Sequence, residues 1–315
     1  MKDAMKIVVT PRGFAKCGLE NAKKIEDAVF LLDYNATGNA YTKEEFYEKT
    51  ADAHGVIVGV EQVDKAYIDA HPKLRAVVKF GVGTDNIDLD YCREKGIFVG
   101  RTAGSNARSV AETAISFLFA DSKNLYESIA DTRAHQWSKL TGYEIGGKTI
   151  GIVGFGAIGK KVAQMAFGLG MKVLAYDPYF IDAEAAKAFN VEVVSFEEIL
   201  KRSDFVSLHI PLTEETKDAV TLKEMKTMKQ SAVLINTARG GIVNEADLFA
   251  ALSQGVIRAA YFDVLTSEPP KPDEPLLTLP NFYLTPHIAS RSKEAEKNTA
   301  DMATQIIIDA LNQYK

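Results

Sequence analysis

Short apolar runs alternate along the chain with stretches in which apolar residues recur every three or four positions. Short apolar runs bounded by turn residues are typical of strands buried in a parallel sheet, and the longer period indicates amphipathic helices. In the first hundred residues, the predicted strands are KIVV, VFLLDY, GVIVGV, LRAVVKF and GIFVG, with helices over KEEFYEKTADA and IDLDYCREKG. This alternation predicts a small doubly wound α/β domain.

A long helix is predicted next, over SNARSVAETAISFLFADSKNL, with Ser105 or Asn106 as its N-cap. A second series of strands follows it: KTIGIVG, KVLAYD, VEVV, FVSLHI, AVLINTA, AAYFDV and FYLTP. Parallel strands in this number, separated by helices, make a complete dinucleotide-binding sheet. The segment SKEAEKNTADMATQIIIDALNQ then predicts one terminal helix. The fold class predicted is therefore α/β, with two doubly wound parallel-sheet domains.

Composition narrows the class of protein. The 315 residues suffice for two cores, and the net charge of −5 comes from 42 acidic and 37 basic residues spread along the chain. No block of Lys and Arg indicates a nucleic-acid partner, and no apolar segment has the length of a signal peptide core or a membrane span. Cys17 and Cys92 lack metal-ligand spacing. Free thiols in the cytoplasm and no metal are therefore predicted, with a disulfide as the open alternative.

The stretch GIVGFGAIGKKVA contains the pattern G-x-G-x-x-G directly after a predicted strand and before a predicted helix. Gly154 permits a tight turn, Gly156 lets a pyrophosphate approach the backbone, and Gly159 allows close packing of helix on strand. The next strand ends in Asp177, whose carboxylate can accept hydrogen bonds from the ribose hydroxyls of NAD and repels a 2′-phosphate. NAD is therefore the predicted cofactor. The alternative is that Asp177 only caps a turn before Pro178.

Polar groups suited to hydride-transfer chemistry follow three later strands. Arg239 comes after AVLINTA and before two glycines, Glu268 lies in the loop after AAYFDV, and His287 follows FYLTP. A guanidinium can bind a carboxylate through two parallel hydrogen bonds, and a histidine oriented by a carboxylate can exchange a proton near neutral pH. Because ligands of a doubly wound sheet bind at the carboxyl ends of its strands, the three form one candidate site. A surface ion pair for Arg239 and a structural histidine are the alternatives.

The motifs in their order resemble those of the D-isomer-specific 2-hydroxyacid dehydrogenases, and most of all the phosphoglycerate dehydrogenase branch. The matching stretches run from residue 79 to 290: KFGVGTDNIDL, SVAET, GGKTIGIVGFGAIGKKVA, LAYDP, SLHIPLTEET, NTARGGIVNEADL, FDVLTSEPP and LTPHIAS. The resemblance implies that His287 exchanges a proton with the oxygen on C2 of a 2-hydroxy or 2-oxo acid. It also implies that Glu268 stabilises the charged form of His287, and that Arg239 holds the carboxylate of the substrate and polarises its C2 carbonyl.

The same resemblance assigns binding residues. Cofactor contacts are implied, besides the three glycines, at Thr102, Ala157, Ile158, Asp177, His209, Ile210, Thr237, Ala238 and Asp263, the last toward the nicotinamide carboxamide. The loop at Val82 and Gly83 is implied to offer backbone N–H groups to the substrate carboxylate. Lys79 departs from the arginine that many phosphoglycerate dehydrogenases have there; either it contacts a substrate phosphate as a point charge, or it only ends a strand at the surface.

The family architecture implies a domain plan. Residues 1–101 with 290–315 would form a flavodoxin-like substrate domain, and residues 102–289 a Rossmann NAD domain, with the active-site cleft between them and hinges near residues 102 and 289. A homodimer through the NAD domain is implied, with the region around Trp137 near the partner's site.

The sequence leaves three functional alternatives to consider. The substrate can be D-3-phosphoglycerate, or hydroxypyruvate and glyoxylate. A corepressor-like protein that binds NAD and acts through partner proteins belongs to another class. A formate-dehydrogenase-like enzyme has Gln at the position of Glu268, so Glu268 argues against it.

Overall fold

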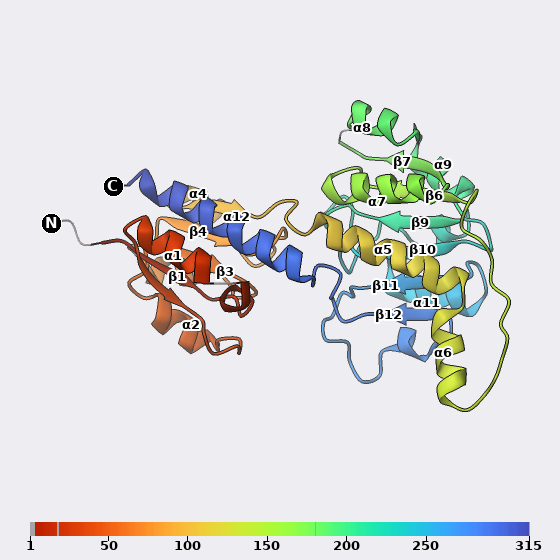
Figure 1. Ribbon diagram of the computed structural model, residues 1–315, viewed down its shortest axis with the longest axis horizontal. Coiled ribbons are helices and arrows are strands. Elements are labelled where there is room, and N and C mark those ends of the chain that lie inside the picture. The colour runs from red at the N-terminus through yellow and green to blue at the C-terminus, as the bar shows by residue number, and fades with distance from the viewer. Residues whose placement is uncertain (1–3, 18, 180, 315) are drawn as a thin grey trace. The chain divides into compact units, whose positions relative to one another are not determined.

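The computed structural model describes residues 4–17, 19–179 and 181–314, and the chain divides into two compact units (Figure 1). We call Met1–Asn106 with Arg291–Lys315 the terminal unit, and Ala107–Ser290 the central unit. The chain thus passes from one unit to the other after residues 106 and 290, whereas the sequence predicted these passages after residues 101 and 289. No helix in the described part of the chain combines the length and apolarity needed to cross a bilayer.

The terminal unit contains a five-stranded parallel sheet in the order β2-β1-β3-β4-β5. This order is that of flavodoxin-like folds. Its strands are β1 Lys6–Val9, β2 Leu31–Tyr34, β3 Gly55–Val58, β4 Ala76–Lys79 and β5 Phe98–Arg101. Its helices are α1 Leu19–Asp27, α2 Lys43–Thr50, α3 Lys65–Ala70, α4 Leu89–Glu94 and α12 Lys293–Asn312, with a 3₁₀ turn at Phe14–Cys17.

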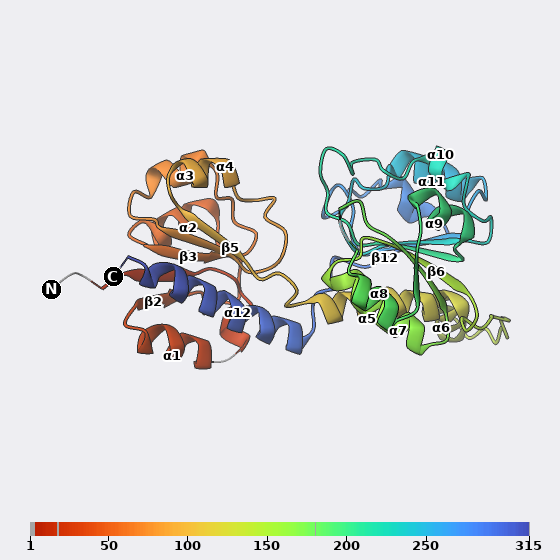
Figure 2. The same cartoon turned by 90° about the horizontal axis from the view of Figure 1, so that it is seen from above.

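Helices cover both faces of this sheet (Figure 2). Ile7 and Val9 of β1 pack with residues of α1 and α12, whereas Val8 between them packs with residues of α2 and α3. Successive side chains of a strand point to opposite faces, so the part of a strand that is buried on both faces is apolar, as β1 is from Ile7 to Val9. Ser292 caps α12 by accepting a hydrogen bond from the N–H of Ala295. The C-terminal helix therefore completes the core of the unit in which the chain begins.

The central unit contains a seven-stranded parallel sheet in the order β12-β11-β10-β9-β6-β7-β8. Its strands are β6 Thr149–Val153, β7 Lys172–Tyr176, β8 Val191–Val193, β9 Phe205–Leu208, β10 Val233–Asn236, β11 Ala259–Phe262 and β12 Phe282–Leu284. Its helices are α5 Ala107–Ser122, α6 Leu125–Arg133, α7 Ala157–Gly168, α8 Ala183–Ala188, α9 Phe196–Arg202, α10 Leu222–Met225 and α11 Glu245–Ser253, with a 3₁₀ turn at Pro275–Thr278. The direction of winding reverses between β6 and β9, which is where such sheets bind their ligands. The predicted fold class of two doubly wound parallel-sheet domains is confirmed.

One predicted element is wrong. The single helix expected over residues 105–125 ends at Ser122, and α6 begins separately at Leu125. Asn124 between them has φ +48°, a left-handed conformation that interrupts a helix and that asparagine tolerates better than most residues. The apolar pattern continues across this break, so periodicity alone did not locate it.

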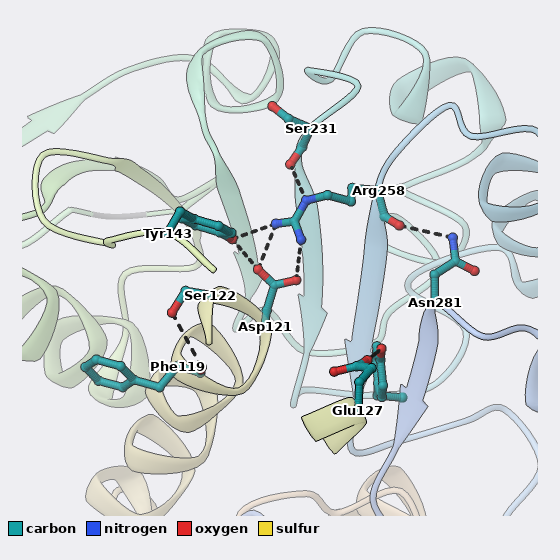
Figure 3. Close-up of polar contacts among 9 residues, drawn as sticks. Phe119, Asp121, Ser122, Glu127, Tyr143, Ser231, Arg258 and Asn281 are labelled. Carbon is teal, nitrogen blue, oxygen red and sulfur yellow. Dashed lines mark hydrogen bonds and ion pairs between the residues drawn. The ribbon is translucent and has the colours of Figure 1, made fainter. Parts of the chain in front are cut away.

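An ion pair between the partly exposed Arg258 and the buried Asp121 fastens the end of α5 to the start of β11 (Figure 3). Arg258 donates to both carboxylate oxygens of Asp121, at 2.6 and 2.7 Å, and to the carbonyl of Ser231 at 3.1 Å. The Tyr143 hydroxyl accepts from Arg258 and donates to Asp121, and burial raises the pKa of this tyrosine, which keeps its proton. These bonds connect four segments that are separate in the sequence.

Arg258→Met is expected to destabilise the central unit by about 3 kcal/mol, because it leaves the buried Asp121 carboxylate without its counter-charge. For a unit of this size, that loss corresponds to a Tm lower by about 6–12 °C, measurable by calorimetry. The control is Arg108→Met, which removes the exposed ion pair with Glu112 in the same unit and is expected to cost less than about 1 kcal/mol. Equal shifts for both variants would show that burial of the Asp121 pair has no energetic consequence.

Candidate active site

The residues that directly follow the strands of the central sheet form one row along its carboxyl edge. The parallel register pairs Val153 with Tyr176 and Leu208, and then pairs Leu208 with Asn236, Asn236 with Phe262 and Phe262 with Leu284. The next residue of each strand extends this row. Across the edge, the row therefore reads Asp177, Gly154, His209, Thr237, Asp263 and Thr285. Five of these six residues are candidates from the sequence, so the topology brings these five candidates to a single edge.

The three glycines of the turn after β6 have different surroundings. A Cβ on Gly154 would lie 2.5 Å from the carbonyl oxygen of His209, and Gly154 has φ +97°. A Cβ on Gly159 would lie 2.0 Å from the carbonyl oxygen of Gly154, so the helix packs directly on the turn. A Cβ on Gly156, which is the N-cap of α7, would meet no protein atom within 4 Å. Protein packing therefore explains the first and third glycines, and leaves open space beside the second, at the N-terminus of a twelve-residue helix.

Asp177 is held at the end of β7 by backbone donors. Its two carboxylate oxygens accept hydrogen bonds from the N–H of Phe155 at 2.7 Å and of Tyr179 at 2.9 Å. The carboxylate therefore bridges the glycine turn and the loop after β7.

Two buried polar atoms in the row have no hydrogen-bond partner in the described part of the chain. They are Nδ1 of His209 and Oγ1 of Thr237. The other ring nitrogen of His209 lies 2.8 Å from the Ser207 hydroxyl, and burial lowers the pKa of His209 to about 3, so the ring is neutral. Buried polar atoms nearly always have a hydrogen-bond partner. These two belong to residues that follow the adjacent strands β9 and β10, so they are neighbours in the row. Together with the open space at Gly156, they fit a dinucleotide bound along this edge.

His287 and Glu268 form a close pair. His287 Nδ1 lies 2.7 Å from Glu268 Oε2, and Glu268 Oε1 accepts a hydrogen bond from the N–H of Leu265 at 3.0 Å. An ionised carboxylate can only accept, so Nδ1 carries a proton and donates. The side chain of His287 is 47% exposed and that of Glu268 is 35% exposed, so the ring is accessible. The hydrogen bond to Glu268 fixes its orientation. Both residues line a pocket of about 220 Å³ together with Asp263, Leu265, Pro269, Pro270, Leu284, Thr285 and Pro286.

Asp263 anchors the segment that carries His287. Its carboxylate is buried and accepts hydrogen bonds from the Thr285 hydroxyl at 2.5 Å and from the N–H groups of Ile288 and Ala289, both at 2.8 Å. Its backbone carbonyl accepts from the N–H of His287 at 3.0 Å. His287 has φ +53°, a conformation costly for a residue with a side chain, and these bonds hold it there. The resemblance assigned Asp263 a cofactor contact; its anchoring of the His287 segment was not predicted.

The loop that carries Arg239 packs against the loop that carries Glu268. A Cβ on Gly240 would lie 2.1 Å from the backbone carbon of Leu265, so the two loops touch and only glycine fits. Arg239 Nη1 donates to the carbonyl of Ala238 at 2.7 Å. Since β10, β11 and β12 are adjacent in the sheet, Arg239, Glu268 and His287 follow three neighbouring strands.

Glu245 is a further residue of this region that the sequence did not single out. Its Oε1 accepts from the N–H of Thr266 at 2.6 Å and from the Thr266 hydroxyl at 2.8 Å, which holds the loop before Glu268. No local pattern indicates such a contact.

The remaining binding candidates belong to both units. Ala157 and Ile158 are the first residues of α7, and Ile210 and Ala238 follow His209 and Thr237. Lys79, Val82, Gly83 and Thr102 lie in the terminal unit. The Thr102 hydroxyl is buried and bonds to the backbone of Gly81, at 2.9 Å to its N–H and 3.0 Å to its carbonyl. In the described ranges, no group of three or more His, Cys, Asp or Glu side chains is arranged to hold a metal ion.

The family model for the NAD-binding domain of D-isomer specific 2-hydroxyacid dehydrogenases matches residues 115–289, more than half of the chain. The chain belongs to this family. The predicted resemblance is thus confirmed, and so is NAD as the cofactor, since the matched region is an NAD-binding domain.

Individual 2-hydroxyacid dehydrogenase relatives differ in how much of their length the chain spans. The chain is 39% identical to a D-3-phosphoglycerate dehydrogenase of Methanocaldococcus jannaschii over 91% of this chain and 55% of that protein. It is 38% identical to a glyoxylate reductase of Korarchaeum cryptofilum over 90% of this chain and 87% of that protein. The chain therefore spans about half the length of the first relative and nearly the whole of the second.

The fold extends to solved structures. The TT0316 protein of Thermus thermophilus superposes with a TM-score of 0.86 at 30% identity, covering 98% of this chain and 97% of that one. The agreement therefore includes both units.

Proposed function

We propose that this protein is an NAD-dependent D-2-hydroxyacid dehydrogenase that transfers hydride between NAD(H) and C2 of a small 2-hydroxy or 2-oxo acid. The observation that carries the proposal is the His287–Glu268 pair, accessible at the carboxyl edge of the NAD-binding sheet and next in the sheet to the Arg239 loop. Bound NADH supplies the hydride. The protein must also supply a proton donor or acceptor, a group that holds the substrate carboxylate, and a group that polarises the carbonyl.

His287 is the proposed general acid of reduction and general base of oxidation. Because Nδ1–H is engaged by Glu268, Nε2 is the nitrogen that exchanges a proton with the oxygen on C2. In reduction the ring gives up this proton and becomes neutral; in oxidation it gains one, and the carboxylate of Glu268 stabilises the resulting charge. Asp263 holds the backbone from which the ring projects.

Arg239 is the proposed ligand of the substrate carboxylate. Its guanidinium carries a permanent charge and a planar fork of donors, which suits a carboxylate and withdraws electron density from the adjacent carbonyl. Backbone N–H groups of Val82 and Gly83 are the other proposed carboxylate donors. The carboxylate is the group that all 2-hydroxy acids share, so these residues define the class of substrate rather than the individual acid.

The NAD-binding residues proposed in the central unit are those of the row and the turn. Gly156 with the N-terminus of α7 would receive the pyrophosphate, and Asp177 the adenosine ribose. His209 Nδ1 and Thr237 Oγ1 supply polar atoms that lack a protein partner among the described residues. Asp263 and the buried Thr102 keep the roles that the family resemblance gives them, in addition to the backbone contacts described above.

Asp177→Ala is expected to raise the relative efficiency with NADPH over NADH by about ten- to a hundredfold, because it removes a negative charge that repels a 2′-phosphate. The ratio of kcat/KM for the two cofactors measures this directly. Asp182→Ala, which removes another carboxylate of the same region, is the control and is expected to leave the ratio unchanged. A wild-type protein that already prefers NADPH would contradict the assignment.

The substrate we propose first is D-3-phosphoglycerate, on the resemblance to the phosphoglycerate dehydrogenases. Hydroxypyruvate and glyoxylate are the second candidates, favoured by the nearly full-length match to a glyoxylate reductase. The deciding experiment compares kcat/KM with NADH for phosphohydroxypyruvate, hydroxypyruvate, glyoxylate and pyruvate. The acid with the highest value identifies the substrate class. No turnover with any of them would contradict the enzymatic proposal and favour an NAD-binding corepressor-like protein.

We further propose a homodimer formed through the central unit. Helix α6 has no buried residue, and it exposes Leu125, Tyr126 and Ile129. Trp137 in the following segment is 80% exposed, and large exposed apolar side chains that gather in one segment are typical of interaction sites. Sedimentation velocity gives the mass in solution; a monomer at micromolar concentration would contradict this part of the proposal.

We also propose a cytoplasmic location. Cys92 is buried and free, and burial raises the pKa of its thiol to about 11, which disfavours the thiolate needed for disulfide exchange. The side chain of Cys17, the other predicted free thiol, lies outside the described residues. Cell fractionation tests the location, and recovery of the protein outside the cell would contradict it.

A further inference from the structure

The ammonium group of Lys79 lies inside a hydrogen-bonded network of the terminal unit. Lys79 is the last residue of β4 and pairs with Val58, the last residue of β3. Its Nζ donates to the carbonyl of Gly59 and to Oδ1 of Asn86, each at 2.5 Å. It therefore joins the loop after β3 to the loop after β4.

Asn86 closes the same network. Its Nδ2 donates to the carbonyl of Glu61 at 2.5 Å and to that of Gly59 at 3.3 Å, and the Glu61 carboxylate accepts from the N–H of Gly59 at 2.7 Å. The side-chain oxygen of Asn86 thus faces Lys79 while its amide group faces the loop after β3. A methionine at position 79 would leave the carbonyl of Gly59 and the amide oxygen of Asn86 without this cationic donor.

The segment that Lys79 and Asn86 bound is the glycine loop, which we define as residues 80–86. Thr102 holds its beginning through hydrogen bonds with the N–H and carbonyl of Gly81. Asn86 holds its end. Between these points, the N–H groups of Val82 and Gly83 have no acceptor among the residues that the structure describes. The loop is therefore fixed at both ends and presents two donors at its centre.

We propose that Lys79 is a positioning residue: it fixes the glycine loop, so that the N–H groups of Val82 and Gly83 can bind the substrate carboxylate, and it is not the ligand of a distal phosphate. The part that concerns substrate rests on the proposed function. Two of the three N–H donors of this ammonium are committed to neutral oxygens of the loops. A phosphate that drew the ammonium away from these oxygens would release the loop that Lys79 holds. Lys79 then contributes equally to the binding of every 2-oxo acid, and other residues determine which acid the protein prefers.

The first test needs no substrate. Hydrogen exchange measured by mass spectrometry on the purified chain is expected to accelerate in peptides covering residues 80–87 by about tenfold in Lys79→Met and in Asn86→Ala. Lys65→Met removes an exposed lysine of the same unit and is the control, with no change expected in these peptides. Lys79→Arg, which keeps the charge and donors, is expected to restore part of the protection. Unchanged exchange in Lys79→Met would overturn the positioning role.

The second test uses two 2-oxo acids that differ by a phosphate group. For Lys79→Met and Asn86→Ala, kcat/KM is expected to fall by about ten- to a hundredfold with both hydroxypyruvate and phosphohydroxypyruvate, mainly through KM, with the double variant no worse than either. A loss at least tenfold larger for the phosphorylated acid in Lys79→Met alone would overturn the proposal. So would inhibition by inorganic phosphate that disappears in that variant. If the wild type turns over neither these two acids nor glyoxylate or pyruvate, the proposed function fails, and the exchange experiment still decides the role of Lys79.

Discussion

Replacing His287 by alanine is expected to lower kcat for the reduction of 2-oxo acids by at least about a hundredfold, because general acid–base catalysis by a positioned side chain contributes about 10²- to 10⁴-fold. Among the described residues that line the 220 Å³ pocket, His287 is the proposed acid because Glu268 orients its ring, whereas the Asp263 carboxylate is occupied by the Thr285 hydroxyl and by backbone N–H groups. NADH binding is expected to change little, because the glycine turn and Asp177, which we propose receive the pyrophosphate and the adenosine ribose, lie at other strands. Stopped-flow or steady-state assays with saturating NADH measure kcat, and quenching of protein fluorescence measures NADH affinity.

A matched control is available for this variant. His135 is exposed, belongs to the same unit and also has a positive φ, at +59° compared with +53° for His287. His135→Ala therefore repeats the change of side chain and backbone preference away from the pocket, and kcat is expected to stay within a factor of about two of the wild type. Turnover retained in His287→Ala would contradict the proposed acid, and an equal loss in both variants would indicate a general effect on the fold.

The sequence predicted the fold well because the apolar pattern of a parallel sheet is strong. The central strands are buried on both faces, as β3 is from Gly55 to Val58, so they appear as continuous apolar runs between turns. The passage of α12 back to the terminal unit was predicted as well, but only from the family architecture. The break after α5 was not, since it depends on the left-handed conformation of Asn124, which the apolar pattern does not encode.

The site was predictable to the extent that it follows strand ends. Arg239, Glu268 and His287 were singled out because each follows a predicted strand, and the topology does make these strands neighbours. The hydrogen bonds that hold the loops around these residues were not predictable. The hydrogen bonds of Asp263 with residues 285–289, and those of Lys79 with Gly59 and Asn86, join residues whose proximity depends on how loops of adjacent strands fold.

Lys79 shows why residue type alone was insufficient. From the sequence, it was either a phosphate ligand or an exposed strand end, because a lysine side chain can reach several ångströms in any direction. The structure shows a third arrangement, with the ammonium turned toward loop carbonyl and amide oxygens. The direction of a flexible side chain is set by acceptors that only the folded chain brings near.

Arg239→Met is expected to lower kcat/KM for 2-oxo acids by about 10²- to 10³-fold, since losing a buried charged partner of an anion costs about 2–5 kcal/mol. Part of the loss should appear in kcat, because in the proposed mechanism the guanidinium also polarises the carbonyl as charge develops on its oxygen. The loop itself is expected to keep its shape, because Gly240 packs on Leu265 and the Asn236 side chain bonds to the backbone of residues 238 and 239.

Arg239→Lys separates charge from geometry. Lysine keeps the positive charge but lacks the planar fork, so an intermediate loss is expected, with KM rising more than kcat falls. Arg202→Met, which removes an arginine on α9 paired with Glu192, is the control and is expected to leave kcat/KM within about twofold of the wild type. Added guanidinium ion is expected to restore part of the activity of Arg239→Met and none of that of His287→Ala. If Arg239→Met and Arg202→Met had the same kinetics, Arg239 would be a surface arginine, and the carboxylate would have to be bound by the backbone donors of Val82 and Gly83 alone.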